Sequence, residues 1–473
     1  MSNAEFCTSK TPGLVASDKR RAAEFPKAGN SALPAPRQSL RQGNPAVATV
    51  FASALVLVVT SSLWAQNRQS NRSAGPPDLP VLLHSAEEAL NRKDFATAAT
   101  ALKSVVERQP DFVPAWFNLG YAYSGLHQED DAVKAYQKAL ELKPDLFEAR
   151  LNLGILLVEL NKPEAALEQL AKAVALQPKH SRAHLYYGRA LSLVDQAAEA
   201  EKQFQQTLAL DPKLAVADFD LGQLKLKQKR FDEALAAFKK AAELDAALPQ
   251  AELGMALASE GLNRPAEAIP HFEKYLAAKP DDLETRFHLA RVDLQLGRNE
   301  EAFENLETVY RGKPELPGLA AALGDVNALL KRFPESEKFY RQAVAASPNE
   351  ADLHRALGQT LLDEQKFAEA EAEFRQSLKI DPHNREAAKG LASSLYLEKR
   401  YGEAIPIIEA LLHAPDPPAG LYFVQATCYD ALRDRPKALE AYERYLELSQ
   451  HQNPDQEWQA RQRAKLLRRE LRK

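Results

Sequence analysis

Two histidines four residues apart, His180 and His184, have the spacing of a metal site. On one helix they would direct two imidazoles to the same face, as zinc ligands require. However, Pro178 places His180 in a turn, and no acidic or cysteine ligand follows nearby. We therefore expect no metal to be bound by this pair.

Residue patterns for catalysis are missing as well. The sequence contains no G-x-x-x-x-G-K-[ST], G-x-G-x-x-G, H-E-x-x-H or G-x-S-x-G motif. The acidic pairs Asp281-Asp282 and Glu300-Glu301 stand where helices are expected to start, and negative charge there complements the helix dipole. These observations predict a protein that is not an enzyme and needs no cofactor.

Charge is unevenly distributed along the 473 residues. Residues 1–72 hold nine Lys/Arg and three Asp/Glu, and residues 451–473 hold seven and three, so the net charge of −4 leaves about −14 on residues 73–450. Because nucleic-acid binding relies on clustered Lys/Arg, we expect no nucleic-acid partner. The two cysteines, Cys7 and Cys428, form no disulfide framework, and we expect Cys428 to be a small packed residue.

A helix–turn–helix pattern of 34 residues organises the chain. In residues 113–146, Trp116, Leu119, Gly120 and Tyr123 keep the spacing W-x2-L-G-x2-Y. Three further series recur at multiples of 34 residues. Prolines stand at 110, 144, 178, 212, 280, 314, 348 and 382. Small residues expected at position eight of each unit are Gly120, Gly154, Gly188, Gly222, Ala256, Ala290, Gly324, Gly358, Ala392 and Ala426. Small residues at position twenty are Ala98, Ala132, Ala166, Ala200, Ala234, Ala268, Ala302, Ser336, Ala370, Ala404 and Ala438.

This periodicity predicts an all-α fold, an α-solenoid, preceded by an N-terminal apolar segment. One unit cannot bury its own apolar face, so the units must stack. The small residues allow the two helices of a unit to approach, and bulky residues at position twenty-four fill the space between units. The expected units are 79–112, 113–146, 147–180, 181–214, 215–248, 249–282, 283–316, 317–350, 351–384, 385–418 and 419–452, eleven in all over 79–452.

Prolines inside the units mark helix boundaries. Pro163, Pro265, Pro334 and Pro436 are expected to open the second helix of their units, where a missing N–H is tolerated. Pro270 and Pro406 fall one turn inside such helices, which we expect to bend or open there.

The segments outside the repeats have different compositions. Residues 1–45 are basic and without periodicity, which predicts disorder. Residues 46–63 are uncharged, so 46–65 is interpreted either as a cleaved signal peptide or as a membrane anchor with its N-terminus inside. Both interpretations place the repeats on the exported side of the membrane. Residues 66–78 are a polar linker.

The C-terminal segment, 453–473, is expected to form a capping helix that covers the last unit. A basic helix that binds a membrane surface or a partner is the alternative. The apolar residues of this segment are Trp458, Leu466, Leu467 and Leu471.

The 34-residue units resemble the tetratricopeptide-repeat family over about four-fifths of the chain, and the chain looks like an exported or membrane-anchored member of bacterial type. The resemblance implies a right-handed superhelix whose first helices line a concave groove for extended peptides or partner helices. It implies binding rather than catalysis. In the family, positions two, five, six, nine, twelve and thirteen of each 34-residue unit face the groove. The groove-binding candidates that the resemblance places at these positions are Asn118, Tyr121, Asn152, Arg182, Tyr186, Arg189, Gln223, His288, Arg291, Arg355 and Lys389.

One subfamily binds the C-terminal carboxylates of chaperones through five polar groove residues. Asn152 and Arg182 suit that pattern, whereas Phe117, Tyr121 and Tyr186 replace the polar residues it needs. A chaperone cofactor is therefore disfavoured.

The sequence favours a non-enzymatic scaffold that binds peptides or proteins in its groove and is exported or tethered to the membrane. The alternative is a structural subunit of an envelope complex, acting through self-association or beside an enzyme. Neither hypothesis identifies the partner.

Overall fold

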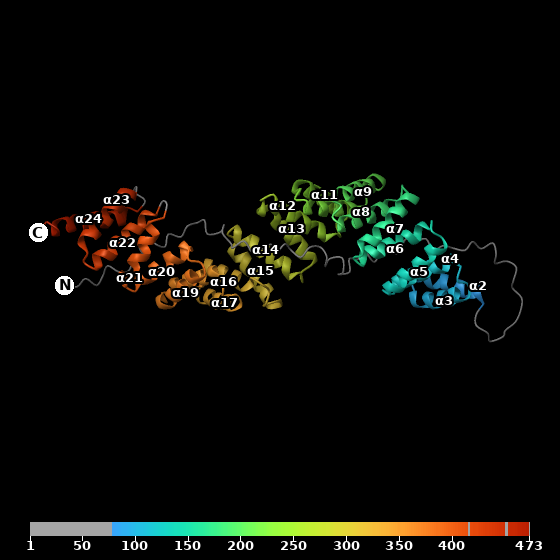
Figure 1. Ribbon diagram of the computed structural model, residues 1–473, viewed down its shortest axis with the longest axis horizontal. Coiled ribbons are helices and arrows are strands. Elements are labelled where there is room, and N and C mark those ends of the chain that lie inside the picture. The colour runs from blue at the N-terminus through green and yellow to red at the C-terminus, as the bar shows by residue number, and fades with distance from the viewer. Residues whose placement is uncertain (1–77, 415–416, 450–452, 473) are drawn as a thin grey trace. The chain divides into compact units, whose positions relative to one another are not determined.

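The computed structural model describes residues 78–414, 417–449 and 453–472, and Figure 1 shows them as paired helices. Over these ranges the chain contains 23 helices and no strand. Their contacts divide the described chain into a first unit, residues 78–275, and a second unit, residues 276–472. The division falls inside α13 (Pro265–Ala278), the helix that carries Pro270.

The first unit is a stack in which every helix from α2 to α12 packs on the next one in the chain. Its helices are α2 (Leu79–Asn91), α3 (Phe95–Arg108), α4 (Val113–Gly125), α5 (Glu129–Leu142), α6 (Phe147–Glu159), α7 (Pro163–Leu176), α8 (Ser181–Leu193), α9 (Ala197–Leu210), α10 (Ala215–Lys227), α11 (Phe231–Leu244) and α12 (Pro249–Gly261).

The second unit is built in the same way from α14 to α24. Its helices are α14 (Leu283–Gln295), α15 (Asn299–Gly312), α16 (Leu319–Leu329), α17 (Phe333–Ala346), α18 (Ala351–Asp363), α19 (Phe367–Ile380), α20 (Arg385–Leu397), α21 (Tyr401–Leu412), α22 (Ala419–Ala431), α23 (Arg435–Leu448) and α24 (Pro454–Glu470). The prediction of an all-α solenoid is confirmed. We call the even-numbered helices α2–α22 A helices and the odd-numbered helices α3–α23 B helices.

Prolines delimit the helices as expected. Pro163 and Pro265 are the first residues of α7 and α13, and Pro334 and Pro436 stand in the first turns of α17 and α23. The helices α13 and α21 both continue through their internal prolines, and α21 has 12 residues where the other B helices have 14. Because α21 runs from Tyr401 to Leu412, on both sides of Pro406, this proline does not interrupt the helix.

The turn between the two helices of each pair has one residue with a left-handed backbone. It recurs every 34 residues, at Lys93, His127, Asn161, Asp195, Lys229, Asn263, Gly297, Lys331, Gln365, Lys399 and Arg433, with φ between 54° and 73°. One of these is glycine and three are Asn or Asp, which tolerate this conformation, whereas it is strained for the other residue types. At the lysine and arginine positions the tight turn is therefore imposed by the packing of the two helices, and the residue type does not reveal it.

Contacts between position eight and position twenty-four form the centre of each pair. A Cβ on Gly188 would lie 2.7 Å from the ring of Phe204, and one on Gly222 would lie 2.8 Å from the ring of Phe238. The glycines thus let the bulky side chain lie directly on the backbone of the A helix. The position-twenty-four side chains are all buried, as expected: Leu102, Tyr136, Leu170, Phe204, Phe238, Phe272, Leu306, Tyr340, Phe374, Ile408 and Tyr442.

A side chain at position four joins several pairs to the proline that ends the preceding one. Arg150 Nε donates to the Pro144 carbonyl at 2.7 Å, and its Nη1 donates to Gln169 Oε1 at 2.8 Å. His354 Nε2 lies 3.0 Å from the Pro348 carbonyl oxygen, and the other ring nitrogen contacts Glu373 on α19, the B helix of the same pair. These bonds satisfy carbonyls that the helix end leaves without partners.

The last helix, α24, packs on α23. Ala460, Ala464 and Leu467 are buried against the last pair, whereas Trp458 and Leu466 are exposed. Small side chains at spacings of three and four allow α24 to lie close to its neighbour. Of the apolar residues named for this segment, Leu467 is therefore the one that packs on the repeats.

Cys428 is a buried free cysteine in α22, as expected, and burial raises the pKa of its thiol to about 12. The predicted disordered region, signal peptide or anchor and linker lie outside the described residues, apart from Asp78. Among the helices that the structure describes, none is both long and apolar enough to span a bilayer.

Candidate functional site

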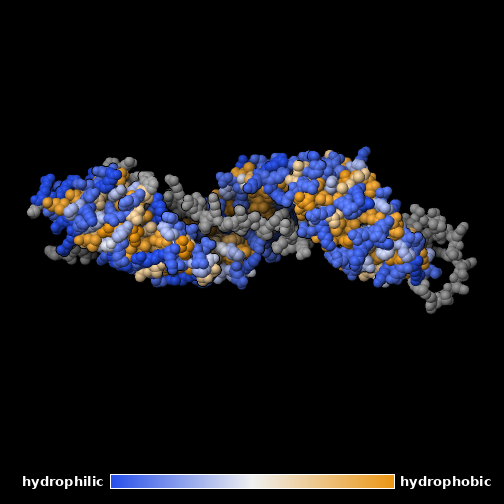
Figure 2. Space-filling view, in the orientation of Figure 1, coloured by the Kyte–Doolittle hydropathy of each residue, from blue (hydrophilic) through white to orange (hydrophobic). Residues whose placement is uncertain are grey.

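The A helices from α4 to α12, and those from α14 to α20, each contact the next A helix and form a wall in their part of the chain. In the first unit, α4 contacts α6, α6 contacts α8, and α8 and α12 both contact α10. In the second unit, α16 contacts α14 and α18, and α18 also contacts α20. We call these two surfaces the first and second A-helix walls. Apolar residues reach the surface among polar ones over α6 and α8 (Figure 2).

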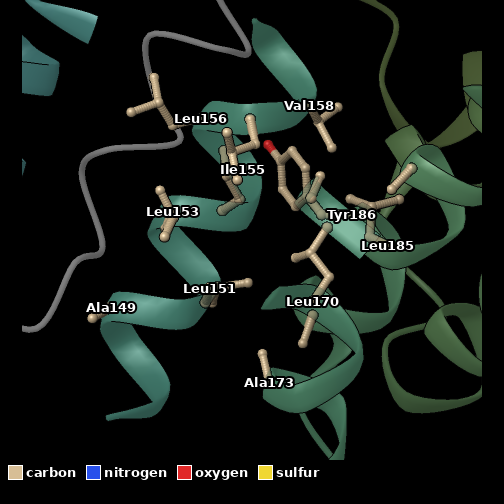
Figure 3. Close-up of a cluster of buried hydrophobic side chains, with 14 of the residues drawn as sticks. Ala149, Leu151, Leu153, Ile155, Leu156, Val158, Leu170, Ala173, Leu185 and Tyr186 are labelled. Atoms are coloured by element: carbon tan, nitrogen blue, oxygen red, sulfur yellow. The ribbon is translucent and has the colours of Figure 1, made fainter. Parts of the chain in front are cut away.

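Three of the predicted binding residues are almost completely buried in the first wall. Tyr186 projects from α8 toward Ile155 and Val158 of α6 and is 2% exposed (Figure 3). Tyr121 packs edge-on against Phe95, with ring centroids 5.8 Å apart. Tyr186 joins two neighbouring A helices and Tyr121 joins α4 to the B helix α3, so their position suits support of the wall more than contact with a partner.

Asn118, on α4, is also buried, with 8% exposure. Its Oδ1 has no hydrogen-bond partner within the described chain. An unpaired buried acceptor is unfavourable by about 1–3 kcal/mol.

An ion pair crosses from α8 to α10 in the same wall. Arg189 Nε donates to Asp220 Oδ2 at 2.5 Å, and the Arg189 guanidinium lies 4.9 Å from the centre of the Tyr186 ring. The side chains of Arg189 and Asp220 are only 20% and 9% exposed. Burial raises the pKa of Asp220, and the positive charge of Arg189 opposes that rise. Burial also raises the pKa of Glu159, at the end of α6, and the positive charge of Arg189 partly opposes this rise.

The structure thus adds residues to the wall that the sequence-based set lacked. Asp220 stands at position six of its 34-residue repeat, and Glu159 stands at position thirteen of its own. Asp325, in the second wall, stands at position nine of its repeat. All three positions are among those that the family resemblance assigns to the groove. Inspecting those positions for acidic residues as well as basic and amide ones would have found them.

Other predicted residues of the first wall are partly exposed. Asn152, Arg182 and Gln223 lie on α6, α8 and α10, three consecutive A helices. Amide side chains such as those of Asn152 and Gln223 can both donate and accept hydrogen bonds. The structure therefore brings these three predicted residues onto one surface.

The predicted residues of the second wall are distributed over three helices. His288 and Arg291 are on α14, Arg355 is on α18 and Lys389 is on α20, all partly exposed. Arg355 and Lys389 each pair with an acidic residue three positions earlier on their own helix, at 3.2 and 2.7 Å. Both pairs are local and leave the basic groups at the surface.

Asp325 on α16 is the most perturbed acid of the second wall. The Tyr340 hydroxyl donates to Asp325 Oδ1 at 2.5 Å. Burial raises the pKa of Asp325 to about 6, although the Tyr340 hydrogen bond and Arg355 both favour the ionised form. The folded chain therefore binds this proton more tightly than the unfolded chain, whose value is near 3.8.

Replacing Asp325 by Asn should stabilise the chain at neutral pH. The stability that the raised pKa contributes is complete below about pH 4 and is lost as pH rises to about 6. Asn keeps an acceptor for Tyr340 without a charge, so we expect a gain of up to about 3 kcal/mol at pH 7.5 and little change at pH 4. Urea unfolding followed by circular dichroism at both pH values measures this difference. Glu386→Gln, which removes an exposed charge, is the control, and an equal effect of Asp325→Asn at both pH values would contradict the assignment.

The histidine pair at the start of α8 makes structural hydrogen bonds. His180 Nδ1 accepts from the backbone N–H of Ala183 at 3.2 Å, which caps α8. His184 Nε2 lies 2.9 Å from the Pro178 carbonyl, and its Nδ1 lies 2.7 Å from the side-chain oxygen of Gln203. Because a carbonyl only accepts, Nε2 carries a proton. Within the described ranges, no group of three His, Cys, Asp or Glu side chains is arranged to hold a metal ion.

Several solved structures are similar to parts of this chain. A structure of MamA from Desulfovibrio magneticus RS-1 is 24% identical, with a TM-score of 0.35, over 36% of this chain and 96% of its own. Yeast Tom70 is 16% identical, with a TM-score of 0.32, over 83% and 96%. PilW, described as a widely conserved type IV pilus biogenesis factor, is 23% identical, with a TM-score of 0.41, over 46% and 100%. None of the curated proteins compared with the chain matches it.

Family models described as tetratricopeptide repeat match the chain in several overlapping segments. One matches residues 113–146, a second matches 151–215, 194–252, 219–283 and 355–420, and a third matches 263–315. Together they cover more than half of the 473 residues. The resemblance seen in the glycine, alanine and proline spacing is therefore confirmed, and the chain belongs to the tetratricopeptide-repeat family.

Proposed function

We propose that this chain is a non-enzymatic scaffold that binds extended peptide segments of partner proteins along its first A-helix wall. The repeats themselves make it a protein–protein interaction scaffold. The observation that carries the finer proposal is the row of partly exposed polar side chains on three consecutive A helices, Asn152, Arg182 and Gln223. An extended peptide has backbone donors and acceptors at regular intervals, and these side chains can satisfy both kinds.

The buried part of the wall supports this proposal by making the surface rigid. Tyr186 fills the space between α6 and α8, and the Arg189–Asp220 ion pair joins α8 to α10. Side chains held on a rigid surface lose less entropy when a ligand binds. The exposed amides can then discriminate between ligands while the buried residues keep their spacing.

Replacing Asn152 and Gln223 together by alanine should weaken peptide binding at least about fivefold, because two hydrogen-bonding groups worth about 0.5–1.5 kcal/mol each are removed. A peptide selected from a displayed random library against the full chain, then titrated against both proteins, measures the effect. Gln137→Ala/Gln206→Ala, on exposed faces of α5 and α9, is the matched control. Equal affinity for wild type and the wall variant would rule out this surface.

We also propose that the scaffold works outside the cytoplasm or tethered to a membrane. The support is in the sequence: residues 46–63 are uncharged and follow a basic segment. N-terminal sequencing of the protein recovered from cells distinguishes cleavage after Ala65 from an intact anchor.

The second A-helix wall, with His288, Arg291, Arg355 and Lys389, is the candidate for a separate, more acidic partner segment.

A further inference from the structure

The basic side chains of α24 fall into two groups, of which the first is paired with the protein. Arg463 donates to both carboxylate oxygens of Asp430 on α22, at 2.5 and 2.7 Å. Arg468 donates twice to Glu443 Oε1 on α23, at 2.9 and 2.6 Å. These bonds, together with buried Ala460, Ala464 and Leu467, hold α24 against the last pair.

The second group of cations is free of such partners and points away from the repeats. Lys465, Arg469 and Arg472 are exposed, and the structure shows no ion pair for them among the residues it describes. Trp458 is 65% exposed and Leu466 is 46% exposed. Trp458, Lys465 and Arg469 are seven and four residues apart, which places them on one face of the helix. We call this the outer face of α24.

We propose that the outer face of α24 docks on an anionic lipid surface. Indole rings favour the boundary between headgroups and acyl chains, and Lys and Arg beside them contact anionic headgroups. Each such cation near the surface strengthens the attraction to an anionic membrane. The helix carries three acidic residues. Glu457 and Glu470 form ion pairs with arginines, which leaves Asp455 as the exposed acid near Trp458. The outer face is therefore positively charged in a chain whose repeats are acidic.

A lipid surface fits this face better than a folded protein does. Specific protein interfaces bury about 800 Å² per partner around a well-packed aromatic anchor. The outer face has one ring and one aliphatic side chain, separated by about two turns of helix, with Lys465 between them and Arg469 beyond them. A bilayer accepts such a narrow stripe because it needs no complementary shape. This docking is independent of peptide binding to the first A-helix wall.

Charge-neutral variants of the full chain test the proposal. We expect wild type to sediment with vesicles of equal parts phosphatidylglycerol and phosphatidylcholine, and Lys465→Gln/Arg469→Gln to bind them more than tenfold less tightly. The matched control, Lys379→Gln/Lys399→Gln, removes the same charge from exposed positions on α19 and in the turn after α20, and should bind as wild type does. Vesicles of phosphatidylcholine alone report any binding that does not depend on headgroup charge. Unchanged binding of Lys465→Gln/Arg469→Gln to the anionic vesicles would overturn the proposal.

A second measurement locates the tryptophan. Brominated anionic lipids should quench part of the tryptophan emission of wild type, and Trp458→Phe should lose that part. If the quenching is the same in the variant, Trp458 does not reach the bilayer and the proposal is wrong. If instead the charge variant alters only the molar mass measured by light scattering, the outer face contacts a second copy of the chain, which also excludes lipid docking.

Discussion

Replacing Phe204 by alanine is expected to lower the free energy of unfolding by about 3–5 kcal/mol, because a fully buried ring leaves a cavity that the helices cannot close. Phe204 is 1% exposed and lies directly on the backbone of α8 at Gly188. In a solenoid, stability is the sum of unit terms and interfaces between neighbours. The loss should therefore be largest in α8 and α9.

Hydrogen exchange resolved by peptide, together with urea unfolding by circular dichroism, measures both the size and the location of this loss. Phe333→Ala is the matched control, because Phe333 is a partly exposed phenylalanine at the start of a B helix. We expect less than half of the effect there. A Phe204→Ala variant as stable as the control would mean that the position-twenty-four side chain is not the centre of the pair.

Replacing Asp220 by alanine should destabilise the first unit by about 2–4 kcal/mol, because Arg189 would keep its charge in a place with little water. The pair spans α8 and α10 with a single 2.5 Å hydrogen bond. Burial raises the pKa of Asp220, so the carboxylate itself is held there at an energetic disadvantage that Arg189 offsets. Each charge of the ion pair therefore mainly offsets the cost of burying the other charge, and the pair as a whole adds little net stability.

The double variant Arg189→Met/Asp220→Leu separates these two effects. Removing both charges with apolar side chains of similar length should restore most of the stability that Asp220→Ala loses. Glu199→Ala, which breaks the exposed ion pair with Lys202, should change stability by less than about 1 kcal/mol. Urea unfolding of the four proteins measures the differences. A double variant that is less stable than Asp220→Ala alone would contradict this account.

The ion pair also changes how the wall is interpreted. From the sequence, Arg189 is a groove residue available to a ligand, and reversing its charge would be the natural test. In the structure its guanidinium is used between α8 and α10, so such a variant would disturb the wall itself. Asn152 and Gln223 are the better positions to change, because neither holds two helices together through an ion pair.

Local sequence determined which residues form helices, where those helices stop and which side chains fill the space between them. Glycine or alanine at position eight, alanine at position twenty and proline at the helix ends each act within one helix pair, so their spacing alone predicts an all-α solenoid. The burial of Tyr136, Leu170 and Phe374 could be predicted for the same reason.

Tertiary structure decided everything that depends on two helices distant in sequence. Arg189 meets Asp220 31 positions later, and Arg463 meets Asp430 33 positions earlier, in pairings that no local pattern specifies. The left-handed turn residue is equally hidden, because Lys229 and Arg433 adopt a backbone that their residue types do not favour. The small side chains of α24 face the repeats and Trp458 does not, since close helix packing depends on shape as well as on hydrophobicity. Periodicity thus specifies the fold, while charge pairing across helices specifies the surface that a partner can contact.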